Sequence, residues 1–322
     1  MNKIDLSKNE SPFNNLKEIN DDIFNVLLSL NRYPKNINIL NKLAEYHEID
    51  SDNIYVGNGA ADVIFKVLSV LDINSVTFST PCFDGFKYMV QALNLSENSI
   101  SLFDDGNQNF NGLINSNLFD IVILCNPHNP TGELLSLSKL DELLRCFPKN
   151  KYIILDEVYI DYTKNNVDSL SLLEKYNNLI IVRSFSKSFG LAGLRIGYCI
   201  SNKKIINALK NKTVPYNINS ISSVAACSAL NNICKIKENI DIIIKERCKI
   251  NDELIRYGFS ISNSQANFIW VNAGEKAILY YRYLFDRGLE VKFYDNFGLR
   301  VSVGNEEQNN YFLKVMQDLS NK

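Results

Sequence analysis

This 322-residue sequence has few histidines, no cysteine motif, no long apolar run and no charge excess. Its two histidines, His47 and His128, leave almost nothing from which to build a histidine-ligated metal site or a Ser-His-Asp triad. We interpret His47 as a surface helix residue and His128 as structural. Seven scattered cysteines without a C-x-x-C pair are typical of free thiols in a reducing compartment.

Two further absences indicate where the protein is located and which partners it lacks: long apolar segments and an excess of charge. No run of apolar residues is long enough to cross a bilayer, and the first residues lack the apolar region of a signal peptide. We therefore expect a cytoplasmic protein without a membrane partner. A formal net charge of −2 argues against a nucleic-acid partner. Length predicts two domains, or one large α/β domain with a smaller companion.

One stretch, residues 179–197, combines an apolar strand with a serine-rich turn that carries Lys187. A lysine among small hydroxyls suits an amine that is desolvated, loses its proton and adds to a carbonyl. Ser184, Ser186 and Arg195 could then bind an anion beside it. A solvated turn with a surface lysine is the alternative that this stretch alone leaves open.

Apolar segments of strand length recur in the middle of the chain, with helical patterns between them: residues 119–125, 152–155 and 179–182. This alternation is typical of βαβ units and a parallel sheet. Because loops after parallel strands share one edge of the sheet, Asn129, Asp156 and Lys187 should converge. A buried acid beside a lysine is costly unless it has a cationic partner, which favours a functional role for Asp156.

A glycine-rich turn, residues 57–59, opens a helix expected at 63–71. Backbone N–H groups at such a helix start can bind a phosphate. The turn is not a dinucleotide fingerprint, because Asp62 stands where the third glycine belongs. A phosphate site and an ordinary tight turn both remain open from this segment alone.

Together these parts are a lysine, an acid at a strand end, an anion cradle, an aromatic and an asparagine. Pyridoxal phosphate needs this set. The lysine holds the cofactor aldehyde as a Schiff base, and the acid keeps the pyridine nitrogen protonated. Hydroxyls, an arginine and a helix N-terminus bind the phosphate, and an aromatic covers the ring.

Three motifs carry a resemblance to a known family: residues 126–132 (NPHNPTG), 156–159 (DEVY) and 184–195 (SFSKSFGLAGLR). They resemble fold-type I, class I/II aminotransferases. Within that group the chain is most similar to histidinol-phosphate aminotransferases, on further segments spread over nearly its whole length: residues 9–12, 31–34, 57–59, 215–219, 266–268 and 299–304.

The resemblance implies an α/β fold, a three-layer sandwich with a mostly parallel central sheet and a smaller C-terminal α/β domain. Residues 1–30 would form an N-terminal arm and a helix that joins the small domain. Residues 31–235 would form the large cofactor-binding domain, and residues 236–322 the small domain. A long helix at 240–257 should bridge the two.

The resemblance also assigns roles. Lys187 would be the Schiff-base lysine and proton shuttle, and Asp156 would pair with the pyridine nitrogen. Asn129 and Tyr159 would hydrogen-bond the ring oxygen. The remaining cofactor contacts would be ring stacking by Phe83 and phosphate binding by Ala60, Ala61, Ser184, Ser186 and Arg195. Tyr33 would reach the cofactor phosphate of a partner subunit, which implies a homodimer.

For the substrate, the resemblance implies an anion site at Arg300, with Asn9 and Lys292 beside it. Lys292 stands where the family usually carries an arginine, and a lysine keeps the charge but loses the bidentate fork. Histidinol phosphate itself is therefore less favoured than the broader class of phosphorylated or otherwise anionic amines. An arginine in a solvated edge strand is the alternative reading of Arg300.

These features predict a transaminase acting between a small anionic amine, which we expect to be phosphorylated, and a 2-oxo acid. One rival is a decarboxylase of a phosphorylated amino acid, similar to threonine-phosphate decarboxylases. Another is a non-catalytic, cofactor-sensing part of a regulator, which the slightly negative charge does not favour.

Overall fold

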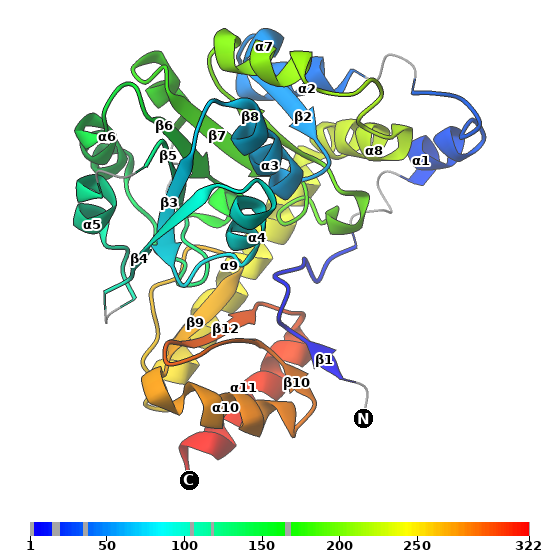
Figure 1. Cartoon of the computed structure of the whole chain (residues 1–322). Helices are drawn as coiled ribbons and strands as arrows, with labels where there is room; N and C mark the ends of the chain where they lie inside the picture. The colour runs from blue at the N-terminus through cyan, green and yellow to red at the C-terminus, as the bar shows by residue number, and fades with distance from the viewer. Residues whose placement is uncertain are drawn as a thin grey trace.

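The computed structural model describes residues 3–14, 20–34, 38–103, 106–116, 119–164 and 169–321 (Figure 1). A large mixed sheet forms the centre of one part, and a smaller three-stranded sheet lies in the C-terminal part. The predicted fold class, a mostly parallel α/β sandwich with a smaller C-terminal α/β part, is confirmed. Within the described residues, no helix has both the length and the apolar character that crossing a membrane requires.

Seven strands make the large sheet, in the spatial order β2 (Ile54–Gly57), β8 (Gly197–Ile200), β7 (Leu179–Ser184), β6 (Tyr152–Asp156), β5 (Ile121–Cys125), β3 (Ser75–Thr80) and β4 (Ser96–Ser101). The strands from β7 to β4 pair in parallel, whereas β8 is antiparallel to both of its neighbours. All five residues of β5 are buried, as expected for a parallel strand covered on both faces.

Helices cover both faces of the large sheet. One face carries α3 (Ala60–Val70), α4 (Gly85–Ala92) and α7 (Lys203–Asn211). The other face carries α2 (Ile39–His47), α5 (Phe110–Asn115), α6 (Leu137–Cys146) and α8 (Ser220–Asn231). Alternation along β7 explains the two layers, since Ile180 and Val182 face the first set while Leu179 and Ile181 face the second.

A long helix, α9 (Ile233–Arg256), runs from the large sheet to the small one (Figure 1). The small sheet has the antiparallel order β11 (Lys292–Tyr294), β12 (Gly298–Ser302) and β9 (Phe268–Asn272). Two further helices, α10 (Ala277–Phe285) and α11 (Glu306–Ser320), belong to this C-terminal part; α10 contacts β11 and β12, and α11 contacts α9 and α10. Short 3-10 helices connect the elements: η2 (Ser51–Asn53), η3 (Ile160–Tyr162), η4 (Ser169–Glu174), η5 (Ala192–Leu194) and η6 (Gly274–Lys276).

The N-terminal region contacts both parts of the molecule. Strand β1 (Ile4–Asp5) pairs in parallel with β10 (Leu289–Glu290), next to the small sheet. Helix α1 (Asn20–Leu27) instead contacts α8 of the large part. The division into residues 1–30, 31–235 and 236–322 stays a prediction.

The secondary structure differs from what the sequence indicates at α9, at residues 289–294 and at β4. Helix α9 begins at Ile233 rather than near residue 240, because its first turns already bury Ile236 against the large sheet's layer. Residues 289–294 form two strands that divide at Val291, since β10 pairs with the arm and β11 pairs with β12. Strand β4 was not expected, because its sequence, Ser-Glu-Asn-Ser-Ile-Ser, is polar and half-exposed.

Candidate active site

A cavity of about 580 Å³ opens at the carboxyl ends of the parallel strands. It collects side chains from the N-terminal arm, from both sheets and from the start of α3. The predicted site residues that line it are Asn9, Ala60, Ala61, Phe83, Asn129, Asp156, Tyr159, Ser184, Ser186, Lys187, Arg195, Lys292 and Arg300. Residues far apart in sequence therefore meet in one place, as the strand-end argument predicted.

Lys187 lies in the turn that follows β7 and faces this cavity. Its Nζ donates a hydrogen bond to the carbonyl oxygen of Lys8, 2.8 Å away, so the arm reaches the lysine. Burial, and then the positive charge of Arg300, lower the pKa of the Lys187 amine to about 8. A larger fraction of this amine is therefore neutral near pH 8 than for an ordinary lysine.

Asp156 is the last residue of β6, and its Oδ1 accepts a hydrogen bond from the Val158 N–H over 3.2 Å. Burial raises the pKa of this carboxyl to about 7. The charge of Glu157 acts in the same direction, and the opposing charge of Lys187 has the smallest effect of all. Among the described residues, this carboxylate thus has no strong cationic partner.

The start of α3 and Arg195 form an anion cradle. Gly59 has a φ of +92°, and a Cβ there would lie 2.6 Å from Nη2 of Arg195, so only glycine leaves room for the guanidinium. Among the described residues no side chain caps α3, and its first N–H groups are free to bind a ligand. Arg195 Nη1 donates to Ser186 Oγ over 3.4 Å.

Asn9 joins the N-terminal arm to the cavity lining through hydrogen bonds of its side chain. Its Nδ2 donates to the Tyr159 hydroxyl over 3.0 Å, and its Oδ1 accepts from Ser302 Oγ over 3.1 Å. Tyr159 is 7% exposed, and the Lys187 ammonium lies 6.0 Å from the centre of its ring. The Asn9 amide is therefore engaged in positioning Tyr159, although the residue also lines the cavity.

Arg300 is buried in the central strand of the small sheet, where it is 7% exposed. Its Nη1 donates to Asn129 Oδ1 over 2.6 Å, and its Nη2 donates to the Ser7 carbonyl oxygen over 2.5 Å. The Nε is buried and has no hydrogen-bond partner among the described residues. The alternative of a solvated arginine in an edge strand is therefore wrong.

The mouth of the cavity carries an ion pair that the motifs did not indicate. Lys292 Nζ lies 2.5 Å from Asp84 Oδ2. Phe83, 39% exposed, stands next to this pair and packs edge-on against Phe86. Tyr294, a buried residue of β11, also lines the cavity. Neither Asp84 nor Tyr294 belongs to a recognisable motif, so their proximity to the site followed only from the fold.

Tyr33 is missing from the described lining residues of this cavity. Its ring stacks on that of Tyr216, with the centroids 4.6 Å apart and the planes at 20°. The two side chains are 74% and 60% exposed. The structure thus places Tyr33 on the surface of its own chain, and the crossing to a partner subunit stays a prediction.

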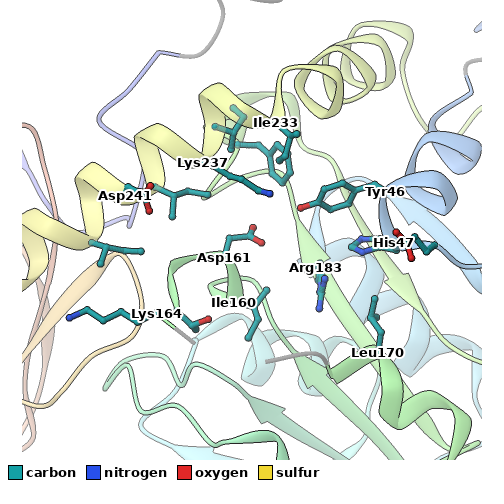
Figure 2. Close-up of a pocket in the computed structure, with 16 residues that line it drawn as sticks. Tyr46, His47, Ile160, Asp161, Lys164, Leu170, Arg183, Ile233, Lys237 and Asp241 are labelled. Carbon is teal, nitrogen blue, oxygen red and sulfur yellow. The ribbon is translucent and has the colours of Figure 1, made fainter. Parts of the chain in front are cut away.

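A second cavity, of about 730 Å³, is lined by residues from α2, η3, β7 and α9 (Figure 2). Figure 2 shows Tyr46, Asp161 and Lys237 pointing into the space between α2 and α9. Its described lining includes none of the predicted site residues. His47 lies here, and its Nε2 is 2.8 Å from the Tyr198 hydroxyl. His47 is half-buried rather than fully at the surface, and this burial lowers its pKa to about 3.

Fold and site together define a lysine-centred enzyme cavity beside an anion cradle. The family described as aminotransferase class I and II matches residues 1–316. The chain belongs to this family, and it is a pyridoxal-phosphate-dependent aminotransferase. The predicted resemblance and the predicted cofactor are confirmed.

Individual relatives carry different names. An aromatic amino acid aminotransferase of Rhodococcus opacus is 27% identical over 316 residues, covering 96% of this chain and 88% of that protein. The histidinol-phosphate aminotransferase structure from Clostridium acetobutylicum is 27% identical, with a TM-score of 0.89 and 99% of each chain covered. An L-threonine-O-3-phosphate decarboxylase from Porphyromonas gingivalis, 22% identical with a TM-score of 0.84 and coverage of 99% and 100%, shares the fold.

Pyridoxal phosphate fits the cavity on observations of this chain. Asp156 is an acid whose raised pKa would return toward its ordinary value beside a positive ring nitrogen. The uncapped start of α3, with Arg195 beside Gly59, suits a phosphate. Lys187 provides an amine of lowered pKa in the same cavity.

Proposed function

We propose that this aminotransferase moves an amino group between a small anionic amine and a 2-oxo acid, and that Arg300 binds the anion of the amine. One observation carries the proposal. The Arg300 guanidinium is buried in the lining of the cavity that also holds Lys187, and its Nε has no hydrogen-bond partner among the described residues. A buried guanidinium with an unpaired donor favours an anionic ligand, because leaving that donor unsatisfied costs free energy.

We propose that the residues of this chain have the roles that the family resemblance implies. When bound, pyridoxal phosphate supplies an aldehyde that exchanges the amino group and a ring that accepts electrons. Lys187 would hold the cofactor through Nζ and then move a proton at the substrate carbon. Asp156 would hold the ring nitrogen in its protonated form. Asn129 and Tyr159 would hydrogen-bond the ring oxygen.

Other residues would position the cofactor. Phe83 would cover the ring face. The phosphate would bind to the backbone and side chains of the cradle, namely Ala60, Ala61, Ser184, Ser186 and Arg195. This arrangement is supported by their common cavity and by the space that Gly59 leaves for the guanidinium.

Two amine classes fit the proposal. Histidinol phosphate represents the phosphorylated amines, and phenylalanine represents amines with a carboxylate; each combines a flat ring with an anion. The aromatic walls at Phe83 and Tyr294 suit a ring, and Arg300 and Lys292 supply positive charge. The names of the relatives support both classes. Asn9 would act on either substrate through the tyrosine that it holds.

A donor screen tests this function. Each amine is mixed with the cofactor-loaded enzyme, and the spectrum is followed for conversion of the pyridoxal form into the pyridoxamine form. We expect conversion with an anionic amine, and much slower conversion at the same amine concentration in the Arg300→Gln variant. Release of carbon dioxide without the pyridoxamine form would overturn the proposal in favour of a decarboxylase of a phosphorylated amino acid.

We also propose a homodimer in which Tyr33 reaches the partner's cofactor phosphate. Its support is the exposed stack of Tyr33 on Tyr216, because two exposed aromatic rings in contact are typical of a surface that another chain covers. The cytoplasmic location stays a prediction.

A further inference from the structure

The ion pair at the cavity mouth joins two distant parts of the chain. Asp84 immediately precedes α4, in the loop after β3, and Lys292 begins β11 of the small sheet. Their charged atoms, Oδ2 and Nζ, lie 2.5 Å apart, and both residues line the cavity. The side chains are 56% and 37% exposed, so the pair contributes little to stability. The effect of the pair on the binding of a charged substrate does not depend on that stability.

Most other cations of the cavity already have an assignment. Lys8 pairs with Asp5 over 2.7 Å. Arg195 lies in the phosphate cradle next to Ser186. Lys187 is the proposed attachment point of the cofactor. Lys292 and Arg300 therefore remain, among the described lining residues, to meet the anion of a substrate.

Asp84 changes the charge that these two residues present. Its carboxylate offsets the ammonium of Lys292, whereas the hydrogen-bond partners of Arg300 in the described part of the chain are neutral oxygens, those of Asn129 and Ser7. Lys292, Arg300 and Asp84 together thus present about one net positive charge to the substrate, and Glu10, which also lines the cavity, adds a further negative charge. A carboxylate carries one negative charge and matches a guanidinium. A phosphate monoester carries roughly −1.5 to −2 at pH 7 and would be repelled by Asp84.

We propose that Asp84 is a specificity-determining residue: by neutralising Lys292, it makes the site prefer an amine with a carboxylate over an amine with a phosphate. The proposal rests on the proposed function, because it takes Arg300 as the anion site. It selects between the two amine classes that the cavity walls accommodate.

Charge removal at Asp84 gives a direct test. In cofactor-loaded enzyme, kcat/KM is measured with histidinol phosphate and with phenylalanine as donors. We expect Asp84→Asn to raise the ratio of phosphate donor to carboxylate donor about tenfold, since one repulsive charge near a dianion is removed. The gain should shrink at high salt. Asp84→Glu should keep the wild-type ratio, which a loss of packing alone would not explain.

Two further variants make the result specific. Adding Lys292→Met to Asp84→Asn should abolish the gain, because the freed cation is its source. Glu45→Gln removes an exposed ion-pair partner of Lys42 on α2, a residue outside the described lining of this cavity, and should leave the ratio unchanged. An unchanged ratio in Asp84→Asn, or an equal gain in Glu45→Gln, would overturn the proposal.

A binding measurement separates this proposal from the proposed function. Inorganic phosphate and 3-phenylpropionate are titrated into the loaded enzyme, since neither can donate an amino group. Tighter binding of phosphate relative to phenylpropionate in Asp84→Asn supports the role of Asp84 even when no donor is turned over. Turnover of donors with no change in this relative affinity overturns the role of Asp84 and leaves the aminotransferase function standing.

Discussion

Arg300 and Asn129, 171 residues apart, are joined by a hydrogen bond of 2.6 Å from Nη1 to Oδ1. The bond links β12 of the small sheet to the loop that follows β5 of the large sheet. The residue proposed to bind the substrate anion and the residue proposed to bind the cofactor ring are therefore positioned together.

Replacement of Arg300 should separate substrate binding from cofactor binding. In Arg300→Gln the charged fork is lost, and we expect kcat/KM for an anionic amine to fall roughly 30- to 100-fold, the usual effect of losing a charge-assisted hydrogen bond. Affinity for the cofactor should change only slightly. Arg300→Lys should lie between the two, because it keeps the charge without the fork. Wild-type kcat/KM in Arg300→Gln would contradict the assignment.

Asp156 should make the cofactor-free protein less stable as the pH rises. Burial raises its pKa to about 7 from 3.8, so the folded state holds a proton that the unfolded state has lost. The resulting decrease in the free energy of unfolding is absent below pH 4. It grows between pH 4 and pH 7, by no more than about 1.4 kcal/mol per pH unit. In urea unfolding, Asp156→Asn should therefore gain more free energy of unfolding, relative to wild type, at pH 8 than at pH 5. The same difference at both pH values would refute this.

The buried ion pair between Arg183 of β7 and Glu157 should be important for the stability of the fold. Arg183 Nη2 lies 2.8 Å from Glu157 Oε2, and the glutamate side chain is fully buried. Arg183→Met would leave that carboxylate unpaired, so we expect a loss of about 3–5 kcal/mol in the free energy of unfolding. The matched control is Arg256→Met, whose exposed pair with Glu253 should be worth less than about 1 kcal/mol. Urea unfolding measures both, and equal losses would contradict the prediction.

Mixed dimers test whether Tyr33 crosses between subunits. Tyr33→Ala and Lys187→Ala proteins should each have little activity alone. If Tyr33 completes the partner's site, a hybrid dimer holds one site with both defects and one site with none. Mixing after dissociation should then restore activity to a substantial fraction of wild type. Activity no higher than the sum of the two parents would show that Tyr33 acts elsewhere.

The meeting of Asn129, Asp156 and Lys187 could be predicted because it depends on the backbone. Each follows an apolar strand, and in a parallel sheet the ends of such strands share an edge. Strands β5, β6 and β7 are neighbours in that order, and the three residues line one cavity. The lysine turn and the glycine-rich turn were likewise visible as local patterns.

Side-chain pairs between distant elements could not be predicted in this way. Asp84 and Lys292 are 208 residues apart, and neither stands in a pattern that indicates its partner. His47 was expected at the surface, since one residue in a helix does not reveal that Tyr198 from β8 covers it. These contacts depend on how the layers pack, which periodicity alone does not define.

The proposed function depends most on Lys187 as the residue that holds the cofactor, and reductive labelling tests this directly. The loaded enzyme is treated with borohydride, digested, and examined by mass spectrometry for a pyridoxyl group. We predict that the label lies on the peptide containing Lys187 and disappears in Lys187→Ala. A label on another lysine, with Lys187 unmodified, would contradict the account.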